Sequence, residues 1–494
     1  MAKKVGIIGA GIGGLATAIR LSANGFKVEV FEKNSGPGGK ISEIQTGKYR
    51  FDMGPSVFTM PELVDQLYEI AGKDSRDHFH YDQLDASCKY FFEDGTQLDA
   101  YSDERALEKE LKEKTGEDEQ NIRNFLSYSK NIYNLTSEVF VFNSIHELKN
   151  LFKKHSLNAL FNVGKIDAFR TMHQANTGFF KSDKVVQLFD RYATYNGSNP
   201  YQVPGTLNII PHLEHNLGTF FPEEGMYSIV RSLEKLAKDT GVNFHYGQSV
   251  KRVEVNHKVV TGVSTDQEML PFDYIVSDVD INYFYEALLP DRKMLEKVRR
   301  PEKSSSALIF YWGMKHQFPG LKVHNILFAK EYRAEFNYLF NKKEIYPDPT
   351  VYLFISSKAV PGDAPEGHEN WYVMINAPEN VGQDWGDFKQ QARKYILEKI
   401  QRMLGVDPEP YIDFEKVVDP VYIENFTSSY HGSLYGNSSN SKFAAFNRHP
   451  NFSKKYQGLY FAGGSVHPGG GIPLCIASAK IVSNKIIQHE KNRN

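Results

Sequence analysis

The sequence predicts an α/β fold in which a Rossmann-like nucleotide-binding part is joined to a second, larger part. Three observations predict it: a strand–glycine–helix fingerprint at residues 5–14, an acid that ends the second apolar run, and a glycine-rich turn near the far end of the chain. At 494 residues the chain is too long for one ordinary core, so we expect two or three subdomains.

The first glycine cluster lies between a predicted strand and a predicted helix. Residues 5–14 read Val-Gly-Ile-Ile-Gly-Ala-Gly-Ile-Gly-Gly. In such a pattern Gly9 permits the tight turn, Gly11 lets the backbone approach a diphosphate, and Gly14 lets the helix pack close to the sheet. The helix that opens at Ile12 directs free N–H groups and its dipole at an anion. We predict a dinucleotide site, with a purely structural glycine turn as the alternative.

Glu32 ends the second apolar run, Val28-Glu-Val-Phe-Glu32. It lies 23 positions after Gly9, near the spacing expected for an acid that accepts hydrogen bonds from a ribose hydroxyl. Together with the glycine turn, this acid completes the dinucleotide-binding pattern.

A second glycine cluster, Gly36-Pro-Gly-Gly-Lys40, follows directly, and Asp52-Met-Gly-Pro-Ser56 comes shortly after it. A nicotinamide-binding fold needs no further glycines here, whereas several flavoprotein families use this loop to pass over the FAD diphosphate and flavin. Lys40 beside paired glycines suits a phosphate or a flavin oxygen. The cluster therefore favours FAD, and an unrelated surface turn is the alternative.

The far end of the chain carries a second candidate cofactor turn. Residues 459–473 read Leu-Tyr-Phe-Ala-Gly-Gly-Ser-Val-His-Pro-Gly-Gly-Gly-Ile-Pro, and an apolar-periodic segment continues to Ile487. We predict a strand, a glycine turn and a helix that tolerates Pro473 in its first turn. Such a helix start directs N–H groups at the edge of an isoalloxazine where negative charge appears on reduction.

These motifs resemble those of bacterial phytoene-desaturase-type carotenoid desaturases, within the amine-oxidase-like FAD superfamily. The resemblance covers essentially the whole chain, and it rests on residues 9–14 with Glu32, 38–40, 52–55, 221–226 and 467–473. The variant Gly-Gly-Ser-Val-His-Pro-Gly-Gly-Gly-Ile-Pro-Leu-Cys at residues 463–475 is more similar to the hydroxycarotenoid 3,4-desaturase branch than to the phytoene-acting branch.

The resemblance implies a Rossmann-like FAD-binding domain of the amine-oxidase or glutathione-reductase type, a discontinuous α+β substrate domain and a helical membrane-associating part. We assign residues 1–85, 221–285 and 440–494 to the FAD-binding domain, and residues 86–220 and 286–439 to the substrate-binding and membrane-associating domain. The implied FAD-binding residues are Gly9, Gly11, Ile12, Gly14, Glu32, Gly39, Lys40, Pro55, Ser56, Val57, Val250, Asp278, Gly463, Gly464, Gly471 and Ile472.

The implied activity is FAD-dependent desaturation of a C40 carotenoid by hydride transfer to the flavin, with the 3′,4′ bond of 1′-hydroxy-γ-carotene as the expected target. Phytoene desaturation, a redox-neutral carotenoid isomerase or retinol-saturase-like reductase, and a non-enzymic prenyl carrier of the Rab-escort type are the alternatives. The second glycine cluster argues against the carrier, since nothing without a flavin requires it. Oxygen or a membrane quinone is the expected electron acceptor, because no separate nicotinamide site is visible.

The sequence identifies no catalytic base. Glu214, Glu223 and Glu224 are the candidates near the expected flavin position. His467 could act as an acid or base, and a purely structural role in the cofactor turn is the alternative. No metal site is predicted, because the residues around His467 lack metal-ligand spacing.

Composition narrows the partners. The formal charge of −2 gives no reason to expect nucleic acid as a partner. The two cysteines, Cys88 and Cys475, exclude a disulfide framework and fit a reducing compartment. Aromatic residues make up 13% of the chain, which favours a long apolar slot for a polyene.

We expect a cytoplasmic protein that associates peripherally with a membrane surface. Residues from about 139 to 165 place lysines between apolar residues at helical spacing, as in a helix that lies in a bilayer interface, and packing on the protein itself is the alternative. The sequence contains no run of 18 or more apolar residues, so we expect no segment that spans a bilayer. Lys3-Lys4 and the apolar residues after them resemble the start of a signal peptide. The nucleotide fingerprint occupies the same segment, and cleavage would remove it, so we expect no signal peptide.

Overall fold

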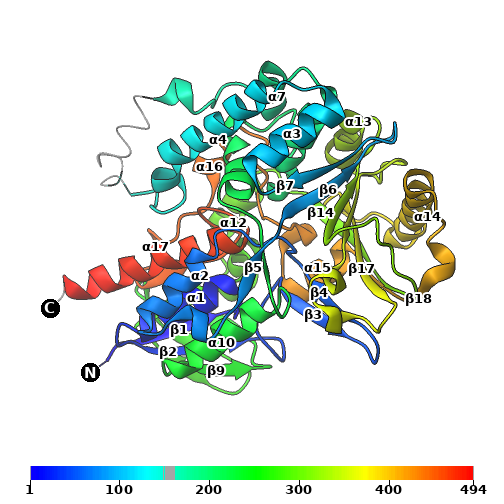
Figure 1. Cartoon of the computed structure of the whole chain (residues 1–494). Helices are drawn as coiled ribbons and strands as arrows, with labels where there is room; N and C mark the ends of the chain where they lie inside the picture. Colours follow the sequence, from blue (N-terminus) through cyan, green and yellow to red (C-terminus); the bar gives the residue numbers. More distant parts are fainter. Residues whose placement is uncertain (1, 148–149, 151–161, 493–494) are drawn as a thin grey trace.

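The computed structural model of the chain describes residues 2–147, 150 and 162–492. Two large sheets organise these residues, one in a nucleotide-binding part that contains the first and last described elements, β1 and α17, and one in a second part beside it (Figure 1).

The nucleotide-binding part is built on a five-stranded sheet in the order β19-β13-β1-β2-β9, in which every pairing is parallel. Its strands are β1 (Lys4–Ile8), β2 (Lys27–Glu32), β9 (Asn243–Tyr246), β13 (Tyr274–Ser277) and β19 (Leu459–Phe461). Val5 and Ile7 of the central strand are completely buried, as expected where helices cover both faces of a parallel sheet.

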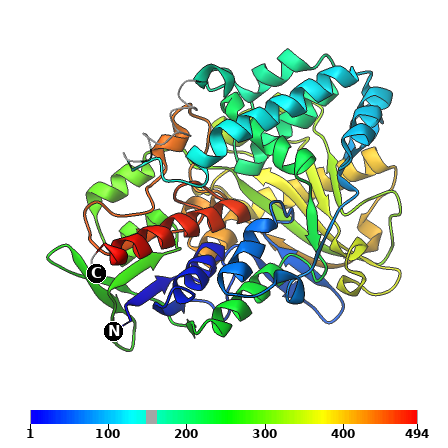
Figure 2. The same cartoon turned by 60° about the vertical axis from the view of Figure 1, so that its left-hand side comes forward.

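Three helices complete this part: α1 (Ile12–Ser22), α10 (Ser228–Asp239) and α17 (Ile472–Lys491). Helix α1 packs against both α10 and α17, and Figures 1 and 2 show α17 beside α1. Strands and helices far apart in the chain therefore meet around the start of α1, and all of them fall within the three segments assigned to the FAD-binding domain. The boundaries of that assignment stay a prediction.

The second part is built on a mixed seven-stranded sheet in the order β18-β14-β17-β16-β15-β6-β7, with one parallel pairing, between β15 and β6. Its strands are β6 (Ala86–Phe91), β7 (Gln97–Tyr101), β14 (Ser306–Met314), β15 (His324–Leu327), β16 (Val351–Phe354), β17 (Glu369–Ala377) and β18 (Ile412–Val418).

The two faces of this sheet have different neighbours, because successive side chains along a strand point to opposite sides. One face carries Trp312 and Trp371 and is covered by α14 (Trp385–Leu404), whose Ile396 lies in the same apolar cluster. The other face carries Tyr90 and Tyr352 and joins the core of the nucleotide-binding part. The second face, which we call the inner face, therefore lies toward the predicted cofactor.

A two-stranded ribbon and a group of helices complete the fold. The ribbon is β3 (Ser42–Gln45) with β4 (Arg50–Met53), and smaller pairings join β5 (Tyr81–Gln83) to β8 (Phe220–Pro222) and β10 (Arg252–Asn256) to β11 (Val259–Ser264) and β12 (Met269–Pro271). The remaining longer helices are α2 (Glu62–Ile70), α3 (Glu104–Thr115), α4 (Glu119–Phe140), α7 (Met172–Phe179), α8 (Asp183–Asp190), α12 (Arg292–Arg299), α13 (Tyr332–Asn337), α15 (Pro420–Thr427) and α16 (Ala444–Asn447).

The segment expected at the membrane begins at the end of α4. Nearly half of it, including Lys149, Phe152, Lys153, Lys154 and Phe161, lies outside the described residues. Over the parts of the chain that are described, every helix is too short or too polar to serve as a membrane span.

Candidate active site

The first turn has the backbone geometry that the fingerprint predicts. Gly9 adopts a φ of +98°, a conformation that side chains disfavour, and its N–H donates to the Phe31 carbonyl oxygen over 2.8 Å. A Cβ atom on Gly14 would lie 2.2 Å from the Gly9 oxygen. Only glycine therefore allows α1 to start this close to the end of β1.

Glu32 is held at the end of β2 with its carboxylate oriented. Its Oε2 accepts a hydrogen bond of 2.9 Å from the Ala10 N–H, and its Oε1 accepts one of 2.9 Å from the Asn34 N–H. Each carboxylate oxygen keeps a further lone pair. The side chain is thus fixed beside the first glycine turn and can accept hydrogen bonds from the hydroxyls of a ribose.

The second glycine cluster lies directly on the first turn. The Gly38 N–H donates to the Ala10 carbonyl oxygen over 2.8 Å, and Gly38 forms an isolated bridge with Gly11. A Cβ atom on Gly39 would contact the Gly11 Cα atom at 3.4 Å. Two stretches of bare backbone therefore face each other where the diphosphate is predicted to bind.

Lys40 connects this loop to the second part of the molecule. Its ammonium donates to the carbonyl oxygens of Ser433, at 3.0 Å, and Leu434, at 2.6 Å. Burial lowers the pKa of Lys40, and the nearby carboxylates of Asp280 and Asp278 act in the opposite direction. Lys40 is thus a cation enclosed between the cofactor loop and residues 433–434.

The C-terminal glycine turn reaches the same place from the other end of the chain. A Cβ atom on Gly13 would lie 2.7 Å from the Gly463 nitrogen, so this turn lies against the start of α1. Gly471 precedes α17 with a φ of +117°, and no heavy atom lies within 4 Å of the position a Cβ atom would take there. Pro473 lies in the first turn of α17, as predicted.

Asp278 follows β13 and faces the same helix start. Its Oδ2 would lie 2.5 Å from a Cβ atom on Gly11, and its Oδ1 would lie 2.1 Å from one on Gly463. Burial raises the pKa of Asp278 to about 7, although the N–H groups of Gly14 and Gly11 counteract part of this shift. A carboxyl group with this pKa lies where an anionic cofactor would approach.

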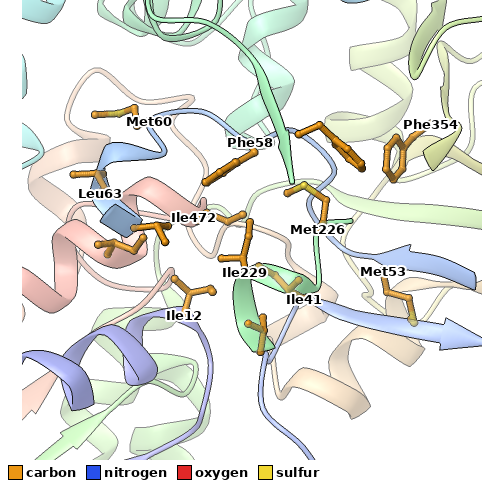
Figure 3. Packing of buried hydrophobic residues seen from close by; sticks show 14 of the residues in the cluster. Ile12, Ile41, Met53, Phe58, Met60, Leu63, Met226, Ile229, Phe354 and Ile472 are labelled. Carbon is orange, nitrogen blue, oxygen red and sulfur yellow. The ribbon is translucent and has the colours of Figure 1, made fainter. Parts of the chain in front are cut away.

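These features together fit an FAD molecule. Three glycine-rich stretches leave bare backbone around the start of α1, and an oriented carboxylate lies at the edge. Figure 3 shows side chains of the buried apolar cluster to which this region belongs, with Ile12 of α1, Ile472 of α17 and Phe354 of β16 among those labelled. The backbone donors suit the diphosphate, Glu32 suits a ribose, and the apolar side chains suit a flat ring system.

The comparison with known families decides the class of protein. The family model described as flavin containing amine oxidoreductase matches residues 12–487, which is nearly the whole chain.

The chain belongs to the flavin-containing amine oxidoreductase family.

Two curated relatives match this flavin-containing oxidoreductase over nearly full length. It is 47% identical over 484 residues to the 1-hydroxycarotenoid 3,4-desaturase of a Flavobacterium species, covering 98% of this chain and 99% of that one. It is 31% identical over 494 residues to the 4,4′-diaponeurosporene oxygenase of Staphylococcus haemolyticus, covering 98% and 97%. The resemblance to carotenoid desaturases is therefore confirmed.

A solved structure supports the fold of this flavin-containing oxidoreductase. An oxidoreductase from Methanosarcina mazei superposes with a TM-score of 0.63 at 14% identity, covering 98% of this chain and 100% of that one. The protein is an FAD-dependent oxidoreductase with a mixed α/β fold, as predicted, and the non-enzymic carrier alternative is set aside.

The remaining implied cofactor residues lie around this centre. Ser56, in the loop after β4, forms a 2.6 Å hydrogen bond with the Tyr352 hydroxyl on the inner face of the sheet, and Pro55 and Val57 flank it. Val250 is buried in the loop before β10, two residues ahead of the strand. Their contacts to the cofactor stay predictions.

The structure separates the candidates for a catalytic base. Glu223 and Glu224 are exposed at the surface, whereas Glu214 is buried. His467 is buried too, and its Nε2 forms a 2.9 Å hydrogen bond with the Asn143 carbonyl oxygen. Burial lowers the pKa of His467 to about 4, so the ring is neutral and the contact is structural.

Glu214 belongs to a buried group that the sequence analysis did not identify as a unit. We call this group the polar cluster, and it consists of Tyr90, Arg191, Tyr192, Tyr195, Glu214 and His215. Both carboxylate oxygens of Glu214 accept 2.6 Å hydrogen bonds, one from Tyr192 and one from Tyr195. The cluster lies at the end of α8, where apolar residues give way to Asp190-Arg-Tyr, and this change in polarity was the available signal.

Arg191 is the cation at the centre of the polar cluster. It donates to the Tyr90 hydroxyl over 2.6 Å and lies 3.7 Å from Glu214. Its guanidinium is also stacked within 5.2 Å of the ring centres of Tyr90, Tyr192 and Tyr195. Burial alone would raise the pKa of Glu214, but Arg191, His215 and the two tyrosine hydroxyls lower it below its usual value.

Proposed function

We propose that this oxidoreductase desaturates carotenoids, introducing the 3′,4′ double bond into a 1′-hydroxylated acyclic end group such as that of 1′-hydroxy-γ-carotene. The observation that carries the proposal is the 47% identity, across 98% of the chain, to a protein named 1-hydroxycarotenoid 3,4-desaturase. The similarity to a 4,4′-diaponeurosporene oxygenase also favours a long polyene as the substrate class.

The inner face of the seven-stranded sheet suits such a substrate. Tyr311, Tyr352, Phe354 and Tyr372 lie on it, on three neighbouring strands, and the ring centre of Tyr372 lies 5.3 to 6.0 Å from those of the other three. Flat, stiff side chains supply apolar contact to a polyene at a low cost in conformational entropy. Because this face lies toward the glycine turns, we propose that the polyene binds between the sheet and the cofactor.

The chain's own residues have binding and positioning roles in this proposal. The Tyr372 hydroxyl donates to the Gly54 carbonyl oxygen over 3.4 Å, and Ser56 bonds to Tyr352, so the cofactor loop is fixed to the substrate-facing sheet. Bound FAD would supply the acceptor for a hydride from the carbon next to the polyene. Apolar walls exclude water from that transfer.

We also propose a peripheral membrane contact, through which the water-insoluble substrate is collected. Phe443 directly precedes α16 and is 68% exposed, and Phe446 lies within α16 and is 57% exposed. The centre of the Phe446 ring lies 5.9 Å from that of Phe140, at the end of α4. These large exposed rings lie beside the start of the segment of residues from about 139 to 165, which carries lysines between apolar residues. They favour a surface that contacts the lipid interface there. Oxygen or a membrane quinone is the proposed electron acceptor.

The decisive experiment is parallel incubation of FAD-loaded protein with phytoene, neurosporene, lycopene and 1′-hydroxy-γ-carotene, followed by mass spectrometry. Loss of one H₂ from the hydroxylated carotenoid alone supports the proposal. Stepwise losses from phytoene would make the protein a phytoene desaturase. An unchanged mass with a shifted retention time would make it an isomerase.

A further inference from the structure

The polar cluster contains hydrogen-bonding atoms that nothing in the described part of the chain satisfies. Arg191 Nε and His215 Nδ1 are buried without a hydrogen-bond partner there, and so is Nε2 of the neighbouring His324. A buried polar atom without a partner is destabilising, and most such atoms in folded proteins are paired. The charges of Arg191 and Glu214 act on both histidines, so these groups lie near one another. A polar group from outside the chain would therefore complete the arrangement.

The cluster is connected to the cofactor loop across the inner face of the sheet. Tyr352 of β16 and Tyr90 of β6 both pair with Ile326 of β15, so all three side chains point to the inner face. His324 lies two residues before Ile326 and shares this face, and its Nδ1 forms a 2.8 Å hydrogen bond with the Tyr352 hydroxyl.

The same tyrosine hydroxyl bonds to Ser56 of the cofactor loop. Two strand spacings of about 4.8 Å therefore separate the strand that contacts the loop from the strand that contacts Arg191. A substrate lying along the inner face with its reacting bond at the flavin can place a nearby end group at the polar cluster.

A hydroxyl group is the ligand whose chemistry matches this arrangement. Its oxygen can accept from the unpartnered Arg191 Nε, and its proton can be donated to a free lone pair of Glu214, whose charge Arg191 maintains. A hydrocarbon end group would leave both charged groups buried without these bonds, which is the penalty that makes buried polar sites selective.

We propose that the polar cluster recognises the hydroxyl of the substrate's acyclic end group and so selects hydroxylated carotenoids over unhydroxylated ones. This inference rests on the proposed carotenoid desaturation and adds the residues that set its substrate class. Arg191 and Glu214 act as specificity-determining residues, and Tyr192 and Tyr195 position the carboxylate.

The test compares 1′-hydroxy-γ-carotene with γ-carotene, as kcat/KM and as the dissociation constant of the FAD-loaded protein. Wild-type protein should prefer the hydroxylated compound by about 10- to 100-fold, the range expected for a hydrogen bond to a charged group. The charge-neutral double variant Arg191→Met with Glu214→Gln should lose this preference. Tyr128→Phe removes another tyrosine–carboxylate bond, to Asp167, and should keep it.

A second variant protects the test against a folding defect. Tyr195→Phe deletes only the hydroxyl that orients Glu214, so it should bind FAD and reduce the preference about 5-fold or more. If both carotenoids are desaturated but the preference is absent in wild type or unchanged in the variants, the inference is overturned while the proposed function stands. If wild-type protein desaturates neither compound, the proposed function fails, and this inference fails with it.

Discussion

The carboxylate of Asp278 lies against Gly11, so close that a Cβ atom on Gly11 would be 2.5 Å from Asp278 Oδ2. The helix start that is expected to hold the FAD diphosphate therefore already faces an acidic side chain. An ionised Asp278 would repel a diphosphate at this position, whereas a protonated one could donate a hydrogen bond to it.

Asp278→Asn should bind FAD more tightly than wild type above about pH 7, because the amide removes the negative charge. In wild type, affinity should rise as the pH falls through about 7, the pKa of this group. Quenching of FAD fluorescence, measured from about pH 6 to about pH 9, tests both points. A variant with the same pH dependence as wild type would show that another group titrates.

The same residue should affect the stability of the protein without cofactor. Its folded-state pKa lies above the ordinary value of 3.8, so the folded protein keeps a proton that the unfolded chain releases. Its contribution to the free energy of unfolding is complete below about pH 4 and is lost as the pH rises to about 7. Denaturant unfolding of wild type and Asp278→Asn should therefore diverge over this interval, with the variant more stable at the upper end.

Glu32→Ala should abolish FAD binding, since it removes the acceptor for the Ala10 and Asn34 N–H groups as well as the predicted ribose contact. Gly11→Val should have the same effect because its side chain would collide with Asp278. The measurement is the flavin absorption spectrum after reconstitution and gel filtration. Glu29→Ala, on the same strand but paired with His245, is the matched control and should stay yellow.

The nucleotide-binding part could be predicted closely, because its signals are local. Helix α1 begins at Ile12, directly after the first glycine turn, and Pro473 lies in the first turn of α17, both as predicted. The ends of α14, in the second part, are encoded locally too: Asp384 accepts hydrogen bonds from the first N–H groups of the helix, and Gly405 ends it with a φ of +71°. Glycine turns and caps specify backbone shape over a few residues, so a single sequence reveals them.

The polar cluster could not be predicted in this way. Tyr90 and Arg191 are 101 positions apart, and their contact depends on how a strand of one segment meets a helix of another. The sequence indicated Glu214 only as a possible catalytic base, because nothing in its local sequence shows that Arg191 lies beside its carboxylate in the fold. Asp278 presents the same problem, because its shifted pKa arises from desolvation by residues that meet only in the fold.

Replacing Phe443 and Phe446 by glutamate should release the protein from membranes. Both rings are more than half exposed, and acidic side chains would oppose insertion between anionic lipid headgroups. Flotation with liposomes that contain anionic lipid measures the bound fraction. Val381→Glu changes a residue that is 53% exposed elsewhere on the surface and should leave binding intact. Wild-type protein that stays with the soluble fraction in every lipid mixture would contradict the membrane contact.

Asp52→Ala should lower the free energy of unfolding by about 3 kcal/mol, because it leaves two backbone donors without their acceptor and removes one of the three carboxylate partners of Arg50. Asp52 is 2% exposed and accepts hydrogen bonds from Arg50, Met226 and Tyr227. Chemical denaturation at neutral pH measures the change. Asp413→Ala breaks an exposed pair with Lys48 and should have little effect.

The hydrogen bond between His467 and the Asn143 carbonyl oxygen joins the C-terminal glycine turn to the segment, residues from about 139 to 165, that is proposed to contact a membrane. Asn143 follows α4, and His146, three residues later, bonds to the Arg448 carbonyl oxygen over 2.9 Å. The start of this segment is thus held at two points, by the His467 side chain of the C-terminal glycine turn and by the backbone of Arg448. The proposed membrane contact and the proposed flavin site are therefore built on one connected set of hydrogen bonds, so a substitution at His467 alters both.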